Sequence, residues 1–568
     1  MISQHSLPHP VKFWQSPRAV LGMSGGILFF FYLLWASLAP REIFWSLDEG
    51  GKYIYLRSIL ESGRLNTPLL YPSQSLDPSF GFVPLYYFLP CDGGICSWWP
   101  LALPLVSLPF YKAFGWLGLF VLPAFFGALS AVLTGGITAR LSGSLKWGMT
   151  ALVLTSLATP VAFYATRFWE HTLSTAGVLG ALWGMLDADE HRRARSAVLA
   201  GVCGSLAVFF RQDAAFLLIG FGLVLLVRRP RLAIYTALSA VLASLPWMTL
   251  NLWTSGHPFG STFGKLVEAD AFSGWQKAGL KLLAYALFNP PRADAFIFPR
   301  WALWTASLSL LAGVVLAFFP RLRWLSLTAF GGVIGVCGWV ALQPTGYQAV
   351  HGAVLAAPQV LFGLYYLLRK PAWKHSAFPA MLAASLLVYG AVYLWRAWVG
   401  AGGLQWGPRY LLSFYPLLVM AALLELYHVH LSGRKRLLTG MMFLFIVASL
   451  VGLSMSFRGL LTARTLTGYY ARTLPVLNAI PNQPLVLASK AFAMDVPALY
   501  FRGNVLSTGG DVEIQQRLMN HLRQMGIKEI YFVSVYLDDN APLEVISERL
   551  KEHPSGVVIT RVDLTGEP

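Results

Sequence analysis

The sequence predicts a mainly α-helical, polytopic membrane protein with about thirteen transmembrane helices and a small extracytoplasmic α/β domain at its C-terminal end. Three observations support this fold class: the composition, the apolar runs and the placement of the basic residues. Of the 568 residues, 56% are hydrophobic and 12% are charged, whereas an average soluble protein has about 25% charged residues. Mean hydropathy is +0.57. This composition excludes a soluble globular protein.

Apolar runs long enough to cross a bilayer, or nearly so, recur along most of the chain. The predicted spans are Ala19–Ala39, Trp116–Ala139, Trp147–Ala165, His171–Leu186, Ala197–Phe210, Ala214–Val227, Leu232–Trp253, Trp301–Phe319, Leu325–Leu342, Ala349–Leu368, Ala380–Trp398, Tyr410–His428 and Leu437–Ser456. The first run is longer than the apolar core of a typical secretory signal, so we expect it to be retained.

Basic residues fall in short clusters between these runs, and their placement predicts the topology. The clusters are Lys12 and Arg18, Arg140 and Lys146, Arg192 to Arg195, Arg228 to Arg231, Arg321 and Arg323, Arg369 to Lys374, and Arg434 to Arg436. All of them lie on the cytoplasmic side if residues 1–18 are cytoplasmic, as the positive-inside rule requires. The net charge of +17 therefore indicates topology, and we expect no nucleic-acid partner.

This topology divides the chain into a transmembrane domain, residues 19–458, and an extracytoplasmic domain, residues 459–568. It also places two large loops outside, residues 40–115 and 254–300. The apolar stretch Trp98–Phe114 is not counted as a span, because it would move every later loop to the wrong side. It contains three prolines, and we predict a re-entrant or interfacial helix.

The cysteines agree with an extracytoplasmic first loop. Cys91 and Cys96 bracket Asp-Gly-Gly-Ile in that loop, where a disulfide would persist. Two free thiols are the alternative. Cys203 and Cys337 lie inside predicted spans, where packing is the simplest role.

The C-terminal domain alternates strand and helix patterns, which predicts a small α/β fold. The strand patterns are Pro484–Ser489, Val505–Ser507, Glu529–Val535 and Gly556–Leu564, and the helix patterns are Val512–Met525 and Leu543–Glu552. The domain has no Gly-rich phosphate loop and no obvious nucleophile. We therefore expect a supporting or acceptor-recognition role.

Asp48 and Glu49 lie just beyond the first span, at the start of an amphipathic stretch, Gly50–Leu65. Carboxylates at a membrane surface are costly to desolvate and indicate a functional site. We expect Lys52 and Arg57 of this stretch to face water, with its apolar residues in the interface. An N-terminal helix cap is the alternative role for the two acids.

A second acidic position, Glu170 followed by His171, comes directly after the third span and is also predicted to lie outside. Together with Asp48 and Glu49, these side chains could orient an acceptor hydroxyl or bind a divalent cation such as Mg²⁺ or Mn²⁺. No ligand spacing makes a metal compelling, and an ordinary polar turn is the alternative.

Three outward arginines supply positive charge at the predicted head-group level. Arg409 precedes Tyr410 in a Trp-Gly-Pro-Arg-Tyr sequence, and Arg292 and Arg300 end the large loop 254–300. A guanidinium suits a phosphate group, so we expect these residues and Tyr410 to bind substrate. Contact with lipid phosphates alone is the alternative.

Two acidic motifs are set aside. Asp187-Ala188-Asp189 has the Asp-X-Asp form that binds metal and nucleotide sugar in soluble glycosyltransferases. The charge pattern places it in a cytoplasmic loop beside Arg192 and Arg193, where a solvated turn is simpler. Arg211 and Asp213 lie outside, and mutual pairing could be their whole role.

Residues 15–460 resemble a GT-C superfamily membrane glycosyltransferase of the dolichyl-phosphate-mannose–protein mannosyltransferase-like type. The similar features are Asp48-Glu49, Glu170, the proline-containing segment before Trp116, and Trp406-Gly407-Pro408-Arg409-Tyr410. Leu287-Phe288-Asn289-Pro290-Pro291-Arg292 also resembles an outer-loop motif of bacterial members. Many relatives have Asp at the position of Glu170, and the resemblance does not extend to the C-terminal domain.

The resemblance implies inverting transfer of a sugar from a polyprenyl-phosphate donor to a glycan, lipid or protein acceptor. Asp48 would be the general base, Glu49 and Glu170 would orient the acceptor or hold a cation, and Arg409, with Arg292, would stabilise the departing phosphate. A site facing outward needs such a donor, because nucleotide sugars are made inside the cell. The alternatives are a transporter or flippase of a lipid-linked sugar, disfavoured because the two halves show no repeat, and a polysaccharide ligase.

Overall fold

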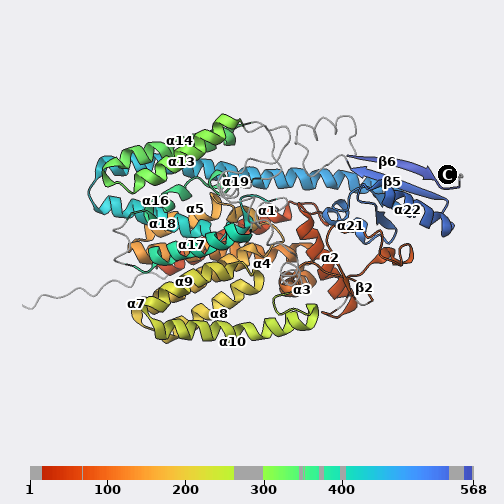
Figure 1. Ribbon diagram of the computed structural model, residues 1–568, viewed down its shortest axis with the longest axis horizontal. Helices are drawn as coiled ribbons and strands as arrows, with labels where there is room; N and C mark the ends of the chain where they lie inside the picture. Colours follow the sequence, from red (N-terminus) through yellow and green to blue (C-terminus); the bar gives the residue numbers. More distant parts are fainter. Residues whose placement is uncertain are drawn as a thin grey trace, which may run out of the picture.

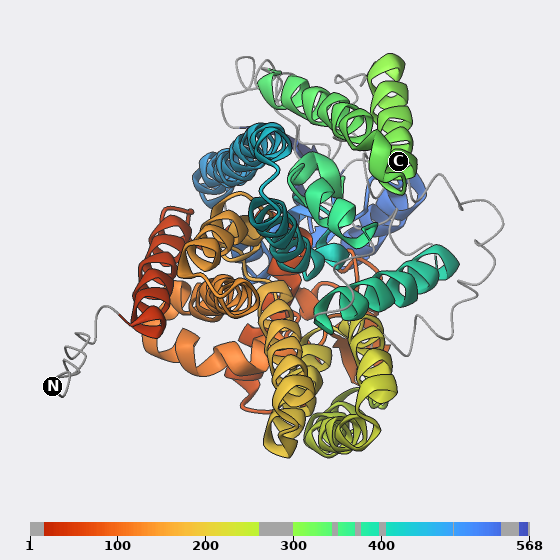
Figure 2. The ribbon, with the colours of Figure 1, turned by 90° about the vertical axis from the view of Figure 1, so that its left-hand side faces the viewer.

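The protein is an elongated bundle of helices with a small sheet domain at one end (Figure 1). The computed structural model describes residues 16–66, 68–91, 93–260, 299–343, 350, 352–369, 376–396, 405–480, 482–535 and 556–565. Viewed from the opposite end, the helices pack side by side around the core (Figure 2). The predicted combination of a mainly helical membrane protein and a small α/β domain is confirmed.

The first half of the bundle follows the predicted spans closely. Its helices are α1 (Pro17–Ser37), α4 (Gly118–Ser142), α5 (Leu145–Leu157), α6 (Val161–Tyr164), α7 (His171–His191), α8 (Ala194–Phe210), α9 (Ala214–Arg228) and α10 (Pro230–Ser255). The second half contains α13 (Arg300–Ala317), α14 (Arg323–Leu342), α15 (Ala353–Ala356), α16 (Val360–Leu367), α17 (Phe378–Arg396), α18 (Phe414–Leu431) and α19 (Lys435–Asn478).

Within the described part of the chain, six helical stretches are long and apolar enough to cross a membrane. They are Pro17–Ser37, Ala102–Ser142, Pro230–Ser255, Pro320–Leu342, Phe414–Leu431 and Lys435–Asn478. Several shorter apolar helices, among them α5, α8 and α9, pack beside them. The total of about thirteen spans stays a prediction.

Two predicted spans are broken in the structure, each at a proline. Trp147–Ala165 divides into α5 and α6 before Pro160, and Ala349–Leu368 divides into α15 and α16 before Pro358. Proline lacks the backbone N–H that continues a helix, and it disfavours helical geometry in the preceding residue. Hydropathy does not register this effect, so the predicted spans were too long here.

The stretch Trp98–Phe114 contains a separate short helix, α3 (Ala102–Phe114), which ends at Gly115 before α4 begins. Its 13 residues measure about 20 Å, less than the thickness of the hydrocarbon core of a bilayer. A re-entrant or interfacial position for α3 stays a prediction.

Helix α19 is much longer than its predicted span, Leu437–Ser456. Its 44 residues extend about 66 Å and run from the bundle into the C-terminal domain (Figure 1). The helix continues 22 residues past Ser456, through a segment that includes polar residues. Where its membrane-spanning part ends stays a prediction. The predicted domain boundary at residue 458 falls inside this helix.

The C-terminal domain is built on a four-stranded sheet in the order β4-β3-β5-β6. Its elements are β3 (Leu485–Leu487), α20 (Phe492–Asp495), α21 (Pro497–Tyr500), β4 (Val505–Ser507), α22 (Val512–Gln524), β5 (Glu529–Val535) and β6 (Val557–Asp563). Strand β3 is parallel to β4 and β5, and β6 is antiparallel to β5. All four strand patterns of the sequence are confirmed; the helix predicted at Leu543–Glu552 lies outside the described residues.

The loop between α1 and α4 packs directly against this domain. It contains α2 (Leu47–Ser62), the hairpin β1 (Leu89–Cys91) and β2 (Gly94–Cys96), and α3. Ser507 N–H donates to the Phe82 carbonyl at 2.8 Å, Val505 N–H donates to Ser73 Oγ at 3.0 Å, and the Tyr500 hydroxyl donates to the Leu70 carbonyl at 2.7 Å. The loop and the C-terminal domain therefore form one continuous packed unit.

At the end of the bundle away from this domain, ion pairs join α4, α7 and the C-terminal end of α9. We name this group the loop cluster; its members are Arg140, Asp187, Asp189, Glu190 and Arg228. Arg140 Nη2 lies 2.5 Å from Glu190 Oε2, and Arg228 Nη2 lies 2.9 Å from Asp189 Oδ2. Basic clusters from separate predicted loops thus meet at the same end of the bundle. Which side of the membrane this end faces stays a prediction.

Candidate functional site

The acidic pair lies in the first turn of α2, held against the C-terminal domain. Phe44 N–H donates to the Asp495 carbonyl of α20 at 2.8 Å. The next residues after the acids are Gly50 and Gly51, and both permit close contacts. A Cβ on Gly50 would lie 1.6 Å from the Met494 carbonyl oxygen. Any side chain at Gly50 would therefore push the start of α2 away from α20.

Glu49 joins two backbone segments by hydrogen bonds to its carboxylate. Its Oε2 accepts a hydrogen bond from Trp45 N–H at 3.2 Å, and its Oε1 accepts one from Phe168 N–H at 2.9 Å. The residue is 1% exposed, and burial raises the pKa of this carboxyl despite the nearby charge of Arg167. The helix-cap alternative thus describes Glu49, which also joins the start of α2 to the loop that carries Glu170.

Asp48 has different partners. Its Oδ1 accepts a hydrogen bond from the Trp99 indole N–H at 3.1 Å, and its Oδ2 forms an ion pair with Arg409 Nη1. Burial acts to raise the pKa of Asp48, but the charges of Arg409 and Lys52 outweigh it and lower the pKa below its usual value. Residues 361 positions apart in sequence therefore meet in one ion pair.

Glu170 is joined to two cations. Its Oε2 lies 2.6 Å from Lys52 Nζ, and its Oε1 lies 3.5 Å from Arg211 Nη1. Burial acts to raise the pKa of Glu170, yet these two cations lower it overall. The prediction that Lys52 faces water was wrong: Lys52 is 4% exposed, because it lies one helical turn after Asp48 on the same face of α2.

Arg211 does more than pair with Asp213. Its Nε donates to Asp213 Oδ1 at 2.9 Å, and its Nη1 lies 2.8 Å from His171 Nε2. Its guanidinium carbon is 4.9 Å from the centre of the Tyr410 ring, and that of Arg409 is 5.3 Å from the same centre. Two guanidinium groups therefore share one aromatic ring. We name Asp48, Lys52, Glu170, Arg211 and Arg409 the site cluster.

Aromatic rings form the wall behind these charges. Trp169 stacks on Tyr164 at 5.2 Å between ring centres, and Arg409 lies 5.6 Å from the Trp169 ring centre. Within the described part of the chain, the buried atoms Trp45 Nε1, Trp169 Nε1 and Arg409 Nε have no hydrogen-bond acceptor. Buried donors are normally satisfied, so these atoms point to a ligand rich in oxygen acceptors.

The structure brings together most of the residues proposed from sequence: Asp48, Glu49, Glu170, His171, Arg409 and Tyr410. Arg292 lies outside the described residues, and Arg300 begins α13. Cys91 and Cys96 form a disulfide that closes the β1–β2 hairpin.

The carboxylates are a poor fit for a resident metal ion. The oxygens of Asp48, Glu49 and Glu170 contact lysine, arginine, tryptophan or backbone N–H donors. Across the described ranges, no group of three or more His, Cys, Asp or Glu residues could hold a metal ion. A divalent cation therefore enters no step proposed below.

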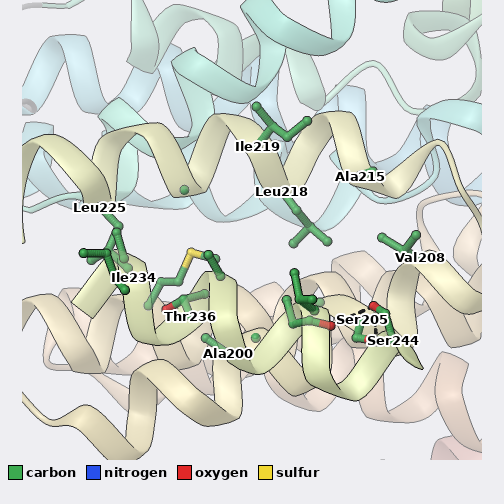
Figure 3. Close-up of a pocket in the computed structure, with 18 of the residues that line it drawn as sticks. Ala200, Ser205, Val208, Ala215, Leu218, Ile219, Leu225, Ile234, Thr236 and Ser244 are labelled. Atoms are coloured by element: carbon green, nitrogen blue, oxygen red, sulfur yellow. Dashed lines mark hydrogen bonds between the residues drawn. The ribbon is translucent and has the colours of Figure 1, made fainter. Parts of the chain in front are cut away.

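A large apolar pocket of about 720 Å³ lies between α8, α9 and α10 (Figure 3). Leu218 of α9 points into this space, and Ser205 and Ser244 share a hydrogen bond of 3.0 Å on the side opposite α9. The pocket reaches Phe259, whose carbonyl accepts a hydrogen bond from the Gln212 side chain at 2.9 Å. One end of the pocket is thus next to the turn that carries Arg211.

Sequence reasoning missed three contributors to the site: Lys52, Trp99 and Trp169. Lys52 could have been found from its spacing, since residues four apart share a helix face. Trp169 adjoins Glu170 in sequence. Trp99 gave no signal, because only the tertiary fold brings it to Asp48.

No family model and no curated protein matches the chain. Among solved structures, the oligosaccharyltransferase AglB of Archaeoglobus fulgidus, in complex with an inhibitory peptide and a dolichol-phosphate, is 14% identical with a TM-score of 0.45, over 90% of this chain and 69% of that one. The apo form of the Archaeoglobus fulgidus oligosaccharyltransferase is 13% identical with a TM-score of 0.47, over 92% and 70% of the two chains. ArnT from Cupriavidus metallidurans, bound to undecaprenyl phosphate, is 13% identical with a TM-score of 0.41, over 97% and 99%. At these values the likeness assigns no role to any residue here, and the mannosyltransferase-like subtype stays a prediction.

Proposed function

We propose that this protein is an integral-membrane glycosyltransferase that moves a sugar from a polyprenyl-phosphate donor to an acceptor hydroxyl. The observation that carries the proposal is the site cluster, in which a carboxylate from the start of the chain meets a guanidinium 361 residues later. Burying several charges together costs free energy, so such a cluster needs a functional reason.

The donor phosphate binds between Arg211 and Arg409. The two guanidinium groups lie over the same Tyr410 ring and repel each other unless an anion lies between them. Asp213 and Asp48 neutralise them in the protein alone. A phosphate offers oxygens to both guanidinium forks at once, which carboxylates on separate segments cannot do.

The prenyl chain of the donor lies in the apolar pocket between α8, α9 and α10. This pocket begins beside the turn that carries Arg211 and is lined mostly by apolar side chains. A chain lying there would place its phosphate at the end nearest Arg211. Burial of apolar surface then contributes most of the affinity, and the two arginines fix the orientation.

Asp48 is the general base of a single displacement. The acceptor oxygen attacks the anomeric carbon and forms the new glycosidic bond, while the bond from that carbon to the phosphate oxygen breaks. The hydroxyl proton passes to Asp48, and the leaving phosphate keeps the electron pair beside Arg409 and Arg211. One in-line displacement inverts the anomeric configuration.

The ion pair between Asp48 and Arg409 sets the order of events. While Arg409 contacts Asp48, it lowers the pKa of the carboxyl and makes it a weak base. A bound donor phosphate competes for Arg409 and leaves Asp48 more basic. Donor binding therefore prepares the base before the acceptor reacts.

The test uses purified full-length protein in lipid nanodiscs with a radiolabelled undecaprenyl-phosphate sugar and a mixture of glycan, lipid and peptide acceptors. A transferase releases undecaprenyl phosphate and labels an acceptor with inverted configuration. A transporter of lipid-linked sugars would move intact donor between leaflets, and that result would overturn the proposal. Addition of EDTA to the same assay tests for a divalent cation.

A further inference from the structure

A second cavity, of about 520 Å³, lies at the end of the bundle that carries the site cluster. It is walled by the loop that follows α2, the β1–β2 hairpin with its disulfide, and the last turns of α10. The Asn66 side-chain amide donates to the Trp253 carbonyl at 3.3 Å, which ties the loop to α10 across the cavity. Its volume falls within the range of about 300–1,000 Å³ that is usual for small-molecule sites.

The lining of this cavity is polar but uncharged. Among the described residues that line it, none carries a charge. Side chains with hydroxyl or amide groups come from all of its walls: Tyr55, Asn66, Ser97, Asn251, Thr254 and Ser255. This composition contrasts with the site cluster, whose members are all charged, and with the aliphatic pocket between α8 and α10.

Two of these polar groups are buried and retain hydrogen-bonding capacity. Tyr55 is 7% exposed, and its hydroxyl makes no hydrogen bond to another described residue. Asn251 is 6% exposed and donates its amide N–H to the Pro258 carbonyl at 3.2 Å, while its amide oxygen has no donor in the described part of the chain. Both groups belong to residues that line the cavity, where they are available to a polar ligand.

Trp99 connects the cavity to the proposed base. It lines the cavity, and its indole N–H donates to Asp48 Oδ1. The other carboxylate oxygen, Oδ2, contacts Arg409. The two oxygens of Asp48 therefore face different sides of the site. Oδ2 faces the arginines, which suit the donor phosphate, and Oδ1 faces Trp99 and the cavity behind it.

We propose that this cavity binds a neutral sugar residue of the acceptor, with Trp99 as the wall that it shares with Asp48. Sugars combine apolar C–H faces with a rim of hydroxyl groups, and the cavity supplies an indole, neutral donors and neutral acceptors. An in-line displacement requires the acceptor and the leaving phosphate on opposite sides of the anomeric carbon, which the two sides of Asp48 provide. The assignment to the acceptor rests on the proposed function; the binding of a neutral sugar does not.

The experiment measures binding of neutral trisaccharides (mannotriose, maltotriose and chitotriose) to full-length protein in nanodiscs, by saturation-transfer NMR and titration. The acidic trisaccharide 3′-sialyllactose is the comparison ligand. We expect at least one neutral trisaccharide to bind and the acidic one to bind at least tenfold more weakly. Equal or tighter binding of the acidic trisaccharide, or no binding of any neutral one, would overturn the proposal.

Variants locate the binding. Ser255→Trp fills the cavity from its rim, and we expect it to raise the Kd of the neutral trisaccharide at least tenfold. Leu252→Trp is the matched control on the same turn of α10, since Leu252 is 54% exposed and does not line the cavity. Asn251→Leu removes the free amide oxygen, together with the hydrogen bond to the Pro258 carbonyl, and tests the cavity without filling it. Unchanged binding in both Ser255→Trp and Asn251→Leu would place the sugar elsewhere.

Failure of this inference can be told apart from failure of the proposed function. Binding of undecaprenyl phosphate is measured on the same proteins, and we expect Ser255→Trp to leave it unchanged. Donor binding and transfer without any effect of Ser255→Trp on the acceptor KM would refute the sugar site alone. Binding of neutral trisaccharide to a protein that shows no transfer would refute the transferase and leave the sugar site standing.

Discussion

The site cluster and the loop cluster contain similar residues but differ in their surroundings. In the site cluster, the side chains of Lys52 and Glu170 are 5% and 11% exposed. In the loop cluster, the side chains of Arg140 and Glu190 are 20% and 60% exposed. Exposed ion pairs contribute little and need no special reason, whereas buried charges are costly. Asp189 of the Asp187-Ala188-Asp189 look-alike is itself buried, with a side chain 8% exposed, but its carboxylate is paired with both Arg228 and Arg229. The site cluster differs because a buried donor, Arg409 Nε, has no acceptor among the described residues. This unused hydrogen-bonding capacity, and not the number of acidic residues, separates the functional candidate from the look-alike.

The substitution with the largest expected effect is Asp48→Asn. It keeps the shape of the side chain and removes its capacity to take a proton, so transfer should fall by about 10²–10⁴-fold. Glu190→Gln, the matched change in the loop cluster, should leave transfer within about twofold, because the Glu190 side chain is 60% exposed. Turnover with radiolabelled donor measures both. Near wild-type turnover in Asp48→Asn, with the protein correctly inserted, would refute the base assignment.

Arg409→Gln should cause the second-largest loss of transfer. It removes one of the two guanidinium groups beside the leaving phosphate, so transfer should fall by about 10²–10³-fold, with weaker binding of undecaprenyl phosphate. Arg228→Gln in the loop cluster is the control and should retain both properties. Loss of transfer with undiminished phosphate binding would contradict the role given to Arg409.

Gly50→Ala tests the close packing of α2 against α20 at the site end. The new Cβ would overlap the Met494 carbonyl, and separation of α2 from α20 should cost about 1–3 kcal/mol of stability. Thermal unfolding in detergent measures this cost as a lower Tm. Gly26→Ala is the control, since a Cβ there meets nothing within 4 Å. Equal Tm values for the two variants would argue against the close approach of α2 and α20.

The pH dependence of transfer tests the coupling between Asp48 and Arg409. A protonated Asp48 cannot accept the acceptor proton, so kcat/KM falls as pH drops through the pKa of that carboxyl. Arg409 and Lys52 lower this pKa in the wild type. The acid limb of residual activity in Arg409→Gln should therefore lie at higher pH than in the wild type. An unmoved acid limb would mean that another group sets it.

The smallest effect is expected for the stability of the loop cluster. The side chain of Glu190 is 60% exposed, so Glu190→Gln should change the free energy of unfolding by less than about 1 kcal/mol. Lys52→Met in the site cluster is the contrast: it leaves Glu170 buried with only Arg211 as a cation and should cost more. Denaturant unfolding ranks the two variants, and a larger loss in Glu190→Gln would reverse the comparison.

Much of this arrangement could be predicted from the sequence because hydropathy and charge act locally. The runs that became α1, α4 and α10 have the length and apolarity of membrane helices, and the strands of the C-terminal sheet carry their own β-branched patterns. Breaks at Pro160 and Pro358 were foreseeable from proline chemistry. The extension of α19 was not foreseeable, because its second half is stabilised by the domain it joins.

The residues of the site also fall into two groups, those that the sequence indicated and those that it did not. Asp48, Glu170 and Arg409 stood out because polar groups beside apolar runs are rare. Their partners did not stand out: Trp99 is one tryptophan among 20, and its contact with Asp48 depends on the path of the whole first loop. The neutral cavity is built from loop, hairpin and helix end, none of which has a distinctive sequence pattern.

The long helix α19 fixes how the C-terminal domain is rotated relative to the helix bundle. Beyond the bundle, Tyr470 OH donates to Asp495 Oδ2, and Arg502 donates to the Leu477 carbonyl at 2.5 Å. Asp495 in turn holds the segment before Asp48. Each inserted residue would turn the distal half by about 100° and advance it about 1.5 Å. An insertion in α19 that preserves these contacts must therefore add close to a whole number of helical turns. Any other insertion would rotate the C-terminal domain away from the segment that carries Asp48.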